Sequence, residues 1–328
     1  MHRKPVFVSA AATAAVLDWG AMIRAVRDAY ALPHTPQTSV RAVARGDGTS
    51  IRGLVSAPPG SACMGAKVFG VARARQVTYL LPLFDQETGE LVALIDALHI
   101  TALRTAATSA VAADRLAPRR PAALGVLGSG AEAQAHVRAL AAVRTLRGVR
   151  LFSPNPANRE RAALDLEREL GVPCVAVATA AAAVESADIV VAAARSRDET
   201  PILDGDWLAP GTLLVSIGST VPEQRELDLR SIQVCDLIVC DAVHEVASET
   251  GDFLAARAAG VAFAGKLASL NDLVAHKLDA RVAAARQPMY KSVGAAVQDV
   301  VIGELAYRAA VGAGLAPEID ARLEIKHV

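Results

Sequence analysis

The chain has few aromatic residues, no excess charge of either sign and only four cysteines. Aromatic side chains make up 4% of its 328 residues, and 34 Lys and Arg balance 34 Asp and Glu. Nucleic-acid-binding proteins need a basic face or stacking aromatic rings, so the composition argues against that class. We expect a globular protein, of two domains at this length, that binds a small neutral or zwitterionic ligand.

Neither the cysteines nor the seven histidines have the spacing of a metal site. Cys63, Cys174, Cys235 and Cys240 form no Cys-x-x-Cys pair and no secreted disulfide framework, so we expect buried thiols. No histidines show the helical spacing of a zinc site such as His-Glu-x-x-His. The sequence therefore predicts no metal.

Long apolar runs are also missing. Charged residues interrupt each run before the roughly 18 residues that a membrane span requires. We therefore expect no membrane association and a cytoplasmic protein. One alternative stays open at the N-terminus, where His2, Arg3 and Lys4 precede an apolar stretch over 6–17 that imitates a secretory signal. The competing interpretation is a strand over 5–9 and a helix that begins near Asp18.

The first 117 residues predict a helix, an antiparallel meander and a second helix. Apolar residues at helical spacing favour a helix over 19–31. Short runs rich in β-branched residues, separated by Gly, Pro and Asp, then predict strands over 39–44, 51–56, 65–71, 77–84 and 91–95. An alanine-rich helix over 100–116 ends before Pro118 and Pro121, where we place a domain boundary.

Beyond this boundary strands and helices alternate, which indicates βαβ crossovers and a mostly parallel sheet. The predicted strands cover 122–127, 149–153, 174–176, 189–193, 213–217 and 237–240, and a long final helix covers 294–313. The fold class is thus α/β, with a central Rossmann-type domain over 118–293. The remaining segments, 1–117 and 294–328, form an α+β domain.

A dinucleotide-binding loop is the most specific physical signal. The strand over 122–127 leads into Gly128-Ser129-Gly130-Ala131-Glu132-Ala133, which has the Gly-x-Gly-x-x-Ala pattern and opens a helix. The first glycine allows a tight turn, the second lets the backbone approach a diphosphate, and the alanine lets the helix pack closely on the strand. The helix N-terminus would hold the diphosphate. We therefore expect a nicotinamide cofactor.

The end of the next strand favours NADP(H) over NAD(H). NAD-binding proteins carry an acidic residue there, which accepts from both ribose hydroxyls and repels a 2′-phosphate. This chain instead has Ser153, Asn155 and, further on, Arg159, which can donate to a phosphate or pair with it. The alternative is that this segment is only a turn with a helix cap and that NAD(H) binds with fewer contacts.

Three isolated cations lie in otherwise apolar surroundings upstream of this loop: Arg41, Lys67 and Arg104. Burying an ion without a partner costs several kcal/mol, so such residues either reach water or bind an anion. Together they suggest a pocket in which Arg41 and Arg104 grip a carboxylate and Lys67 is the titratable member. Three acids, Glu226, Asp228 and Asp252, more simply cap helices or pair with Arg225.

The sequence resembles the ornithine cyclodeaminase/μ-crystallin family almost from end to end. The resemblance is carried by Gly-Ala-Lys-Val over 65–68, Thr-Ala-Leu-Arg-Thr-Ala-Ala over 101–107, the glycine loop, and further motifs over 217–228, 249–252 and 291–299. It implies a homodimer in which the N-terminal segment and the C-terminal helix build the substrate-binding and dimerisation domain. It also implies that Arg41, Lys67 and Arg104 surround the substrate carboxylate.

By the same resemblance, several residues would touch the cofactor. They are Thr105, the loop residues Gly128 to Glu132, Gly218, Ser219 and Ser292. These add to Ser153, Asn155 and Arg159, which were predicted above from the end of the strand over 149–153.

The family holds two chemistries, and the departures of this chain favour one of them. Ornithine cyclodeaminases resemble one another in an acidic residue where this chain has Thr220, and in a glutamate where it has Val55. Neither side chain can act as a carboxylate base. Simple hydride transfer to the Cα of an imino acid needs only a carboxylate clamp, a proton donor and NAD(P)H.

We therefore predict an imino-acid reductase of the ketimine, Δ1-pyrroline-2-carboxylate or alanine dehydrogenase type. Lys67 would bind substrate and set its protonation, and Thr220 or water would relay the remaining proton. Two alternatives stay open, namely ornithine cyclodeamination with release of ammonia, and a cofactor-dependent ligand carrier without turnover.

Overall fold

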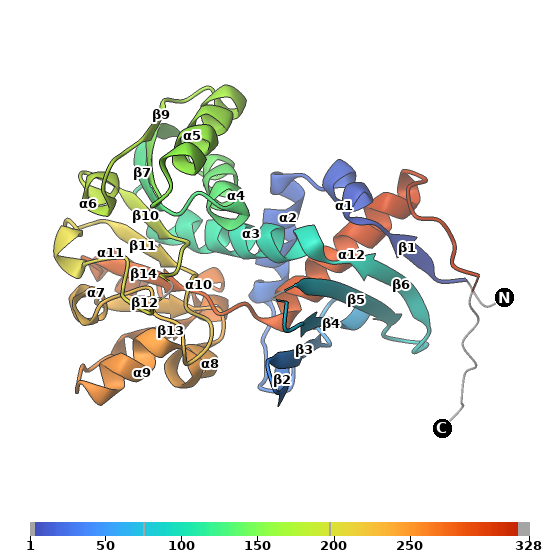
Figure 1. The fold of residues 1–328 in the computed structure, drawn as a ribbon. Helices are drawn as coiled ribbons and strands as arrows, with labels where there is room; N and C mark the ends of the chain where they lie inside the picture. The colour runs from blue at the N-terminus through green and yellow to red at the C-terminus, as the bar shows by residue number, and fades with distance from the viewer. Residues whose placement is uncertain (1–3, 75, 197, 321–328) are drawn as a thin grey trace. The chain divides into compact units, whose positions relative to one another are not determined.

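A computed structural model of the protein describes residues 4–74, 76–196 and 198–320 (Figure 1). The chain divides into two compact units. Unit 1 comprises the described residues up to Arg104 and from Ala295 onwards, and unit 2 comprises Thr105–Gly294. Among the described residues, no helix is long and apolar enough to cross a membrane.

The first change of unit lies inside helix α3 (Leu98–Leu116), ahead of the proline-rich stretch that we expected to separate the domains. The two ends of α3 contact different units, which explains why the boundary lies inside the helix and not at the prolines that follow it. Near its start, Thr101 accepts a hydrogen bond from Lys67 in unit 1. Near its end, Asp114 accepts one from Arg144 in unit 2.

Unit 1 is built on a six-stranded sheet in the order β1-β6-β5-β4-β3-β2. The meander β2 to β6 is antiparallel as predicted, whereas β1 joins β6 in parallel. Gly48 and Gly89 have positive φ angles of 64° and 71° in two of the hairpin turns. The strands are β1 (Val6–Val8), β2 (Ser39–Gly46), β3 (Thr49–Ser56), β4 (Cys63–Val71), β5 (Val77–Asp85) and β6 (Leu91–Asp96).

Three further helices belong to unit 1: α1 (Ala10–Val16), α2 (Trp19–Ala31) and α12 (Ala296–Gly312). The strand over 5–9 and the helix after Asp18 are confirmed, and Asp18 caps α2 by accepting from the Ala21 N–H at 2.9 Å. Helix α1 was not predicted. Residues 1–3, which carry part of the signal-like pattern, lie outside the described residues.

The two faces of the meander differ in what covers them. On one face, Leu54, Lys67 and Leu81 are buried, and α12 packs so closely that a Cβ on its Gly303 would collide with Leu81. The opposite face, which we call the outer face, carries large apolar side chains that are 41–53% exposed in this chain: Val40, Ile51, Val55 and Leu80.

Unit 2 is a Rossmann-type domain whose eight strands are all parallel. Their order is β13-β12-β14-β11-β10-β7-β8-β9. The chain turns from one side of β7 to the other between β9 and β10, so the switch point lies at the adjacent ends of β7 and β10. The strands are β7 (Ala122–Leu127), β8 (Leu146–Phe152), β9 (Cys174–Ala176), β10 (Ile189–Ala192), β11 (Leu213–Ser216), β12 (Leu237–Cys240), β13 (Leu267–Ser269) and β14 (Pro288–Lys291).

Helices flank the strands of unit 2. They are α4 (Ala131–Ala141), α5 (Pro156–Leu170), α6 (Ala180–Val184), α7 (Leu229–Val234), α8 (Val243–Glu249), α9 (Gly251–Ala258), α10 (Leu270–Val274) and α11 (Asp279–Ala284), with short 3₁₀ turns at Gly205–Trp207 and Ala264–Lys266. Strands β10, β11 and β12 are buried at each position, as expected for strands covered on both faces.

Candidate functional site

The glycine turn after β7 has the geometry of a dinucleotide site. Gly128 has a φ of 129°, and a Cβ there would lie 2.6 Å from the Ala193 carbonyl oxygen, so only glycine fits. Gly130 is the N-cap of α4, and no side chain caps that helix. A Cβ at Gly130 would meet no atom within 4 Å, so the side of the turn is open to a ligand. Donors and space therefore fit a diphosphate at this helix N-terminus.

The residues predicted to contact the ribose lie beside this turn. Ser129 donates to the Ser153 hydroxyl at 2.8 Å, which joins the glycine turn to the end of β8. Arg159 donates to the Ser153 carbonyl oxygen at 2.9 Å and lies over the Phe152 ring. The Asn155 side chain caps α5 by accepting a backbone N–H at 3.1 Å, so at this residue the turn-and-cap interpretation is also correct.

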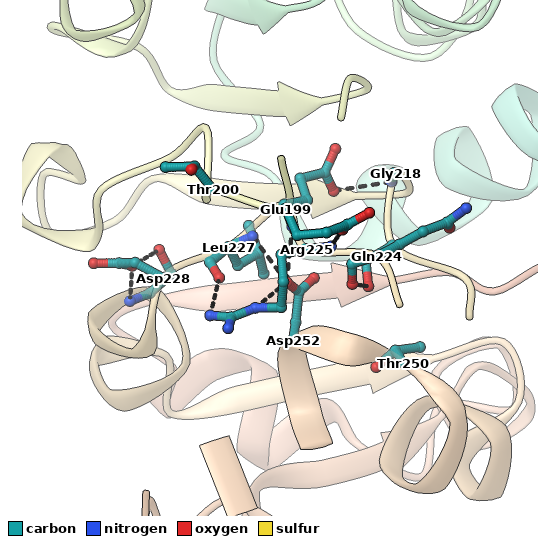
Figure 2. Close-up of polar contacts among 12 residues, drawn as sticks. Glu199, Thr200, Gly218, Gln224, Arg225, Leu227, Asp228, Thr250 and Asp252 are labelled. Atoms are coloured by element: carbon teal, nitrogen blue, oxygen red, sulfur yellow. Dashed lines mark hydrogen bonds and ion pairs between the residues drawn. The ribbon is translucent and has the colours of Figure 1, made fainter. Parts of the chain in front are cut away.

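Hydrogen bonds between residues of the same turn stabilise the turn after β11. Ser219 donates to the Gln224 carbonyl oxygen at 2.6 Å, and Thr220 donates to Gln224 Oε1 from both its backbone N–H at 3.0 Å and its hydroxyl at 3.1 Å. Figure 2 shows Gly218 and Gln224 on this turn. A proton relay through Thr220 therefore requires its hydroxyl to break the hydrogen bond that it donates to Gln224 Oε1.

Other predicted cofactor residues occupy structural positions in unit 2. Thr105 is buried in α3, and Ala131 and Glu132 form the first turn of α4. Ser292 donates to Asp241 at 2.7 Å, and the same carboxylate accepts from the Gly294 N–H at 2.9 Å. Asp241 thereby fixes the segment that ends unit 2.

Two of the three acids have the structural roles that we expected (Figure 2). Asp228 caps α7 by accepting from the Ser231 N–H at 2.8 Å. Asp252 accepts from the backbone N–H groups of Glu226 at 2.8 Å and Leu227 at 3.1 Å, and it pairs with Arg225 at 3.4 Å.

The third acid, Glu226, corrects our expectation, because it neither caps a helix nor pairs with Arg225. It is fully buried and accepts hydrogen bonds from Ser216, Gly218 and Ala194. Its burial raises the pKa of its carboxyl to about 7.

In unit 1, Lys67 and Arg104 meet at one carboxylate. Lys67 Nζ lies 2.8 Å from Asp299 Oδ1, and Arg104 Nε lies 3.1 Å from the same oxygen. All three side chains are at most 7% exposed. Two cations therefore share one anion, and these three residues together carry one positive charge in excess. Such a cluster favours binding of a second carboxylate.

Arg41 lies on the same face of the sheet. Strand register aligns Arg41 with Leu54 and Leu54 with Lys67 across β2, β3 and β4, and cross-strand partners point to one face. Two strand spacings separate the Cα atoms of Arg41 and Lys67 by about 10 Å. The structure thus brings the predicted substrate residues to one face of unit 1.

Asp299 and Gln298 are the site residues that the sequence analysis missed. Gln298 accepts from Arg104 at 2.7 Å and donates to the Tyr30 hydroxyl at 3.0 Å, so it fixes the guanidinium from the other side. Their signal was a Gln-Asp pair inside the apolar first half of α12. A buried polar pair needs partners, and the isolated cations Lys67 and Arg104 were the matching groups.

The cysteines are free and buried, as predicted. Burial raises the pKa of the Cys63 and Cys174 thiols to about 11, so they are unreactive near neutral pH. Within the described ranges, no three His, Cys, Asp or Glu side chains are grouped so that they could hold a metal ion.

Comparison with known proteins identifies the family. Residues 68–314 match the sequence model of the ornithine cyclodeaminase/mu-crystallin family. This chain belongs to that family. Mouse ketimine reductase mu-crystallin is 31% identical over 225 residues, which cover 69% of this chain and 67% of that protein. The Δ(1)-pyrroline-2-carboxylate reductase of Bacillus cereus is 28% identical over 247 residues, 75% of each chain.

The fold of this family member is also that of a solved reductase. The Δ(1)-pyrroline-2-carboxylate reductase of Thermococcus litoralis, solved with NADH and L-proline, superimposes with a TM-score of 0.87 at 25% identity. The match covers 96% of this chain and all of that one. The structural match therefore covers more of the chain than the family model, which spans residues 68–314.

Replacing Asp299 with asparagine tests the ion cluster. Asp299→Asn removes the carboxylate that two buried cations share, which should lower the free energy of unfolding by about 3 to 5 kcal/mol. Urea unfolding measures this loss. Asp47→Asn is the control, because Asp47 pairs with Arg73 on the surface and should not change stability measurably. Equal stability of wild type and Asp299→Asn would contradict the assigned pairing.

Proposed function

We propose that this protein is an NAD(P)H-dependent oxidoreductase that reduces an imino acid to the amino acid. The observation that carries the proposal is the buried pair of cations, Lys67 and Arg104, on a single carboxylate of unit 1. Unit 2 supplies the dinucleotide turn that such a reaction requires. The reductases among its relatives support the same reaction class.

Each group of residues has a distinct role in this reaction. Arg104 and Arg41 bind the substrate carboxylate, and Lys67 donates a hydrogen bond to the substrate and sets its protonation. The reduced nicotinamide, when bound, supplies the hydride for Cα. The imine nitrogen needs one proton, which Thr220 or a water molecule relays. The protein otherwise contributes orientation.

Cyclodeamination needs carboxylate bases that this chain lacks at both positions. Thr220 stands where ornithine cyclodeaminases have one of these acids. Val55, which the sequence aligned with the other, lies on the outer face, away from Lys67, so that alignment does not locate a base at the site. Leu54, the cross-strand neighbour of Lys67, is not an acid either. Reduction requires neither acid, so it is the function that the site supports best.

NADP(H) is the proposed cofactor. Strand β8 ends without an acid, which would repel a 2′-phosphate. Ser153 follows β8, and Arg159 of α5 donates to the Ser153 carbonyl oxygen. The chain would act in the cytoplasm, where NAD(P)H is available and thiols such as its four cysteines stay reduced.

We also propose a homodimer that forms through the outer face. Val40, Ile51, Val55 and Leu80 are large apolar side chains on β2, β3 and β5, and each is 41–53% exposed in the single chain. Contiguous apolar patches of this kind mark protein interfaces. A second copy offers a matching apolar surface through a two-fold interface.

A reduction assay tests the function. Following NADPH and NADH at about 340 nm, the reduced-nicotinamide absorbance, with cyclic imino acids or with pyruvate plus ammonia should show turnover. Lys67→Ala should abolish this turnover and leave the cofactor Kd unchanged, because Lys67 lies in unit 1 and the dinucleotide turn in unit 2.

Three results would contradict the assignment. Full activity of Lys67→Ala would remove Lys67 from the mechanism. Ammonia release from L-ornithine without net NADH change would establish the cyclodeaminase. Tight NADPH binding without turnover of any substrate would indicate a ligand carrier.

Arg159→Leu tests the cofactor preference. Loss of a charge-assisted contact to the 2′-phosphate should raise the Kd for NADPH about tenfold or more and change that for NADH less than twofold. Fluorescence titration measures both constants. Arg161→Leu, an exposed arginine of the same helix, is the control. Tighter binding of NADH than of NADPH by the wild type would reverse the preference.

Val55→Asp tests the dimer. A charge in a buried apolar interface is costly, so this variant should sediment as a monomer while the wild type sediments as a dimer. Val175→Asp is the matched control, since Val175 is 54% exposed but lies in unit 2. A monomeric wild type, or a dimeric Val55→Asp, would rule out this interface.

A further inference from the structure

Glu226 joins two loops that follow adjacent strands of unit 2. Its Oε1 accepts from the Ala194 N–H at 3.2 Å, just after β10. Its Oε2 accepts from the Gly218 N–H at 2.9 Å, just after β11, and from the Ser216 hydroxyl at 2.6 Å. One buried carboxylate therefore receives three donors, two from the loops and one from the last residue of β11.

The loops after β10 and β11 are packed so closely that no side chain fits between them at Gly218. A Cβ at Gly218 would collide with Glu226 and with the Ala194 carbonyl oxygen, so glycine is required there. The preceding residue, Ala193, contacts the glycine turn in the same way, through its carbonyl oxygen and Gly128. The ends of β7, β10 and β11 thus form one layer at the switch point, where ligands of this fold bind.

The charged groups that face Glu226 come from two elements. Lys291 of β14 donates to the Ser216 hydroxyl at 3.0 Å and lies 3.6 Å from Asp252 of α9. Asp252 in turn accepts from the Glu226 backbone N–H at 2.8 Å. Lys291 favours the charged form of Glu226, and Asp252 together with burial opposes it.

We propose that Glu226 is a positioning residue whose carboxylate fastens the loops after β10 and β11 in the conformation that binds the nicotinamide cofactor. Its protonation releases a loop and weakens cofactor binding. This inference rests on the proposed function, because it assumes that the layer at the switch point holds the cofactor.

The sign of the pH dependence follows from hydrogen-bond counting. A carboxylate accepts all three donors, whereas a carboxylic acid carries its own proton and loses at least one of these bonds. Burial raises the pKa of Glu226 to about 7, so the acid form predominates at pH 6 and the carboxylate at pH 8. If only the carboxylate form binds, the cofactor Kd should rise about tenfold from pH 8 to pH 6.

Calorimetric titration of the full chain tests the inference, using whichever of NADPH and NADH binds more tightly. The wild-type Kd should rise about tenfold more between pH 8 and pH 6 than the Kd of Glu226→Gln, whose amide does not titrate. Titration of the cofactor phosphate changes the Kd of both proteins by the same factor, so it cancels when the two pH dependences are compared. Glu223→Gln, an exposed glutamate of the same loop, should follow the wild type.

Hydrogen exchange tests the same inference on the wild type alone, should Glu226→Gln fail to fold. The protection factors of the Ala194 and Gly218 amides should fall between pH 8 and pH 6, after correction for intrinsic exchange. Equal pH dependence of the Kd in wild type and Glu226→Gln, or unchanged protection, would overturn the role of Glu226. No cofactor binding by the wild type at either pH would instead overturn the proposed function.

Discussion

The ion cluster of Asp299 with Lys67 and Arg104 is the interaction on which the account of unit 1 depends. Each cation alone would pay a large desolvation cost at 7% exposure or less, and one carboxylate reduces that cost for both. The three residues come from β4, α3 and α12. The packing of the C-terminal helix against the sheet therefore also determines the charge of the site.

The same cluster would favour binding of a substrate carboxylate. Asp299 compensates one of the two charges, and Gln298 fixes the Arg104 guanidinium by a bond of 2.7 Å. A substrate carboxylate would compensate the second positive charge by pairing with the Arg104 guanidinium, which Gln298 already holds in place. Preorganisation of this kind increases affinity because less side-chain entropy is lost on binding.

In unit 2, close backbone contacts rather than charges determine how the turns after β7, β10 and β11 pack together. Gly128 and Gly218 allow their turns to touch the residues after β10, where any side chain would collide. Glu226 adds polar bonds to this layer without exposing a charge to solvent. Parallel strands place these turns at a single edge of the sheet, which is why motifs 90 residues apart in sequence contribute to one layer.

The sequence predicted the strands and helices whose apolar residues recur at a regular spacing, and the motifs whose residues are close together in the chain. The antiparallel meander, the parallel strands β7 to β12 and the glycine turn followed from alternation and glycine spacing, and all are confirmed. Strands β13 and β14 were missed because the Leu-Ala-Ser of β13 has no β-branched or aromatic residue and because β14 contains Pro288 and Lys291. Short runs of that composition have no strand signal.

Contacts between distant segments were not predictable in the same way. Asp299 is separated from Lys67 by 232 residues, and only the packing of α12 on the sheet brings them together. Glu226 was expected to cap a helix or to pair with Arg225, but its side chain accepts from donors that follow β10 and β11. The family resemblance supplied the roles of Arg41, Lys67 and Arg104, and the structure adds the partners that hold Lys67 and Arg104.

The most direct test compares two substrates that differ only in the carboxylate. For a cyclic imino acid and the same cyclic imine without its carboxylate, the wild-type kcat/KM should differ by about 100-fold or more, as expected for a charge-assisted contact. In Arg104→Met this ratio should fall towards one. A wild-type enzyme that reduces both imines equally well would contradict the carboxylate clamp.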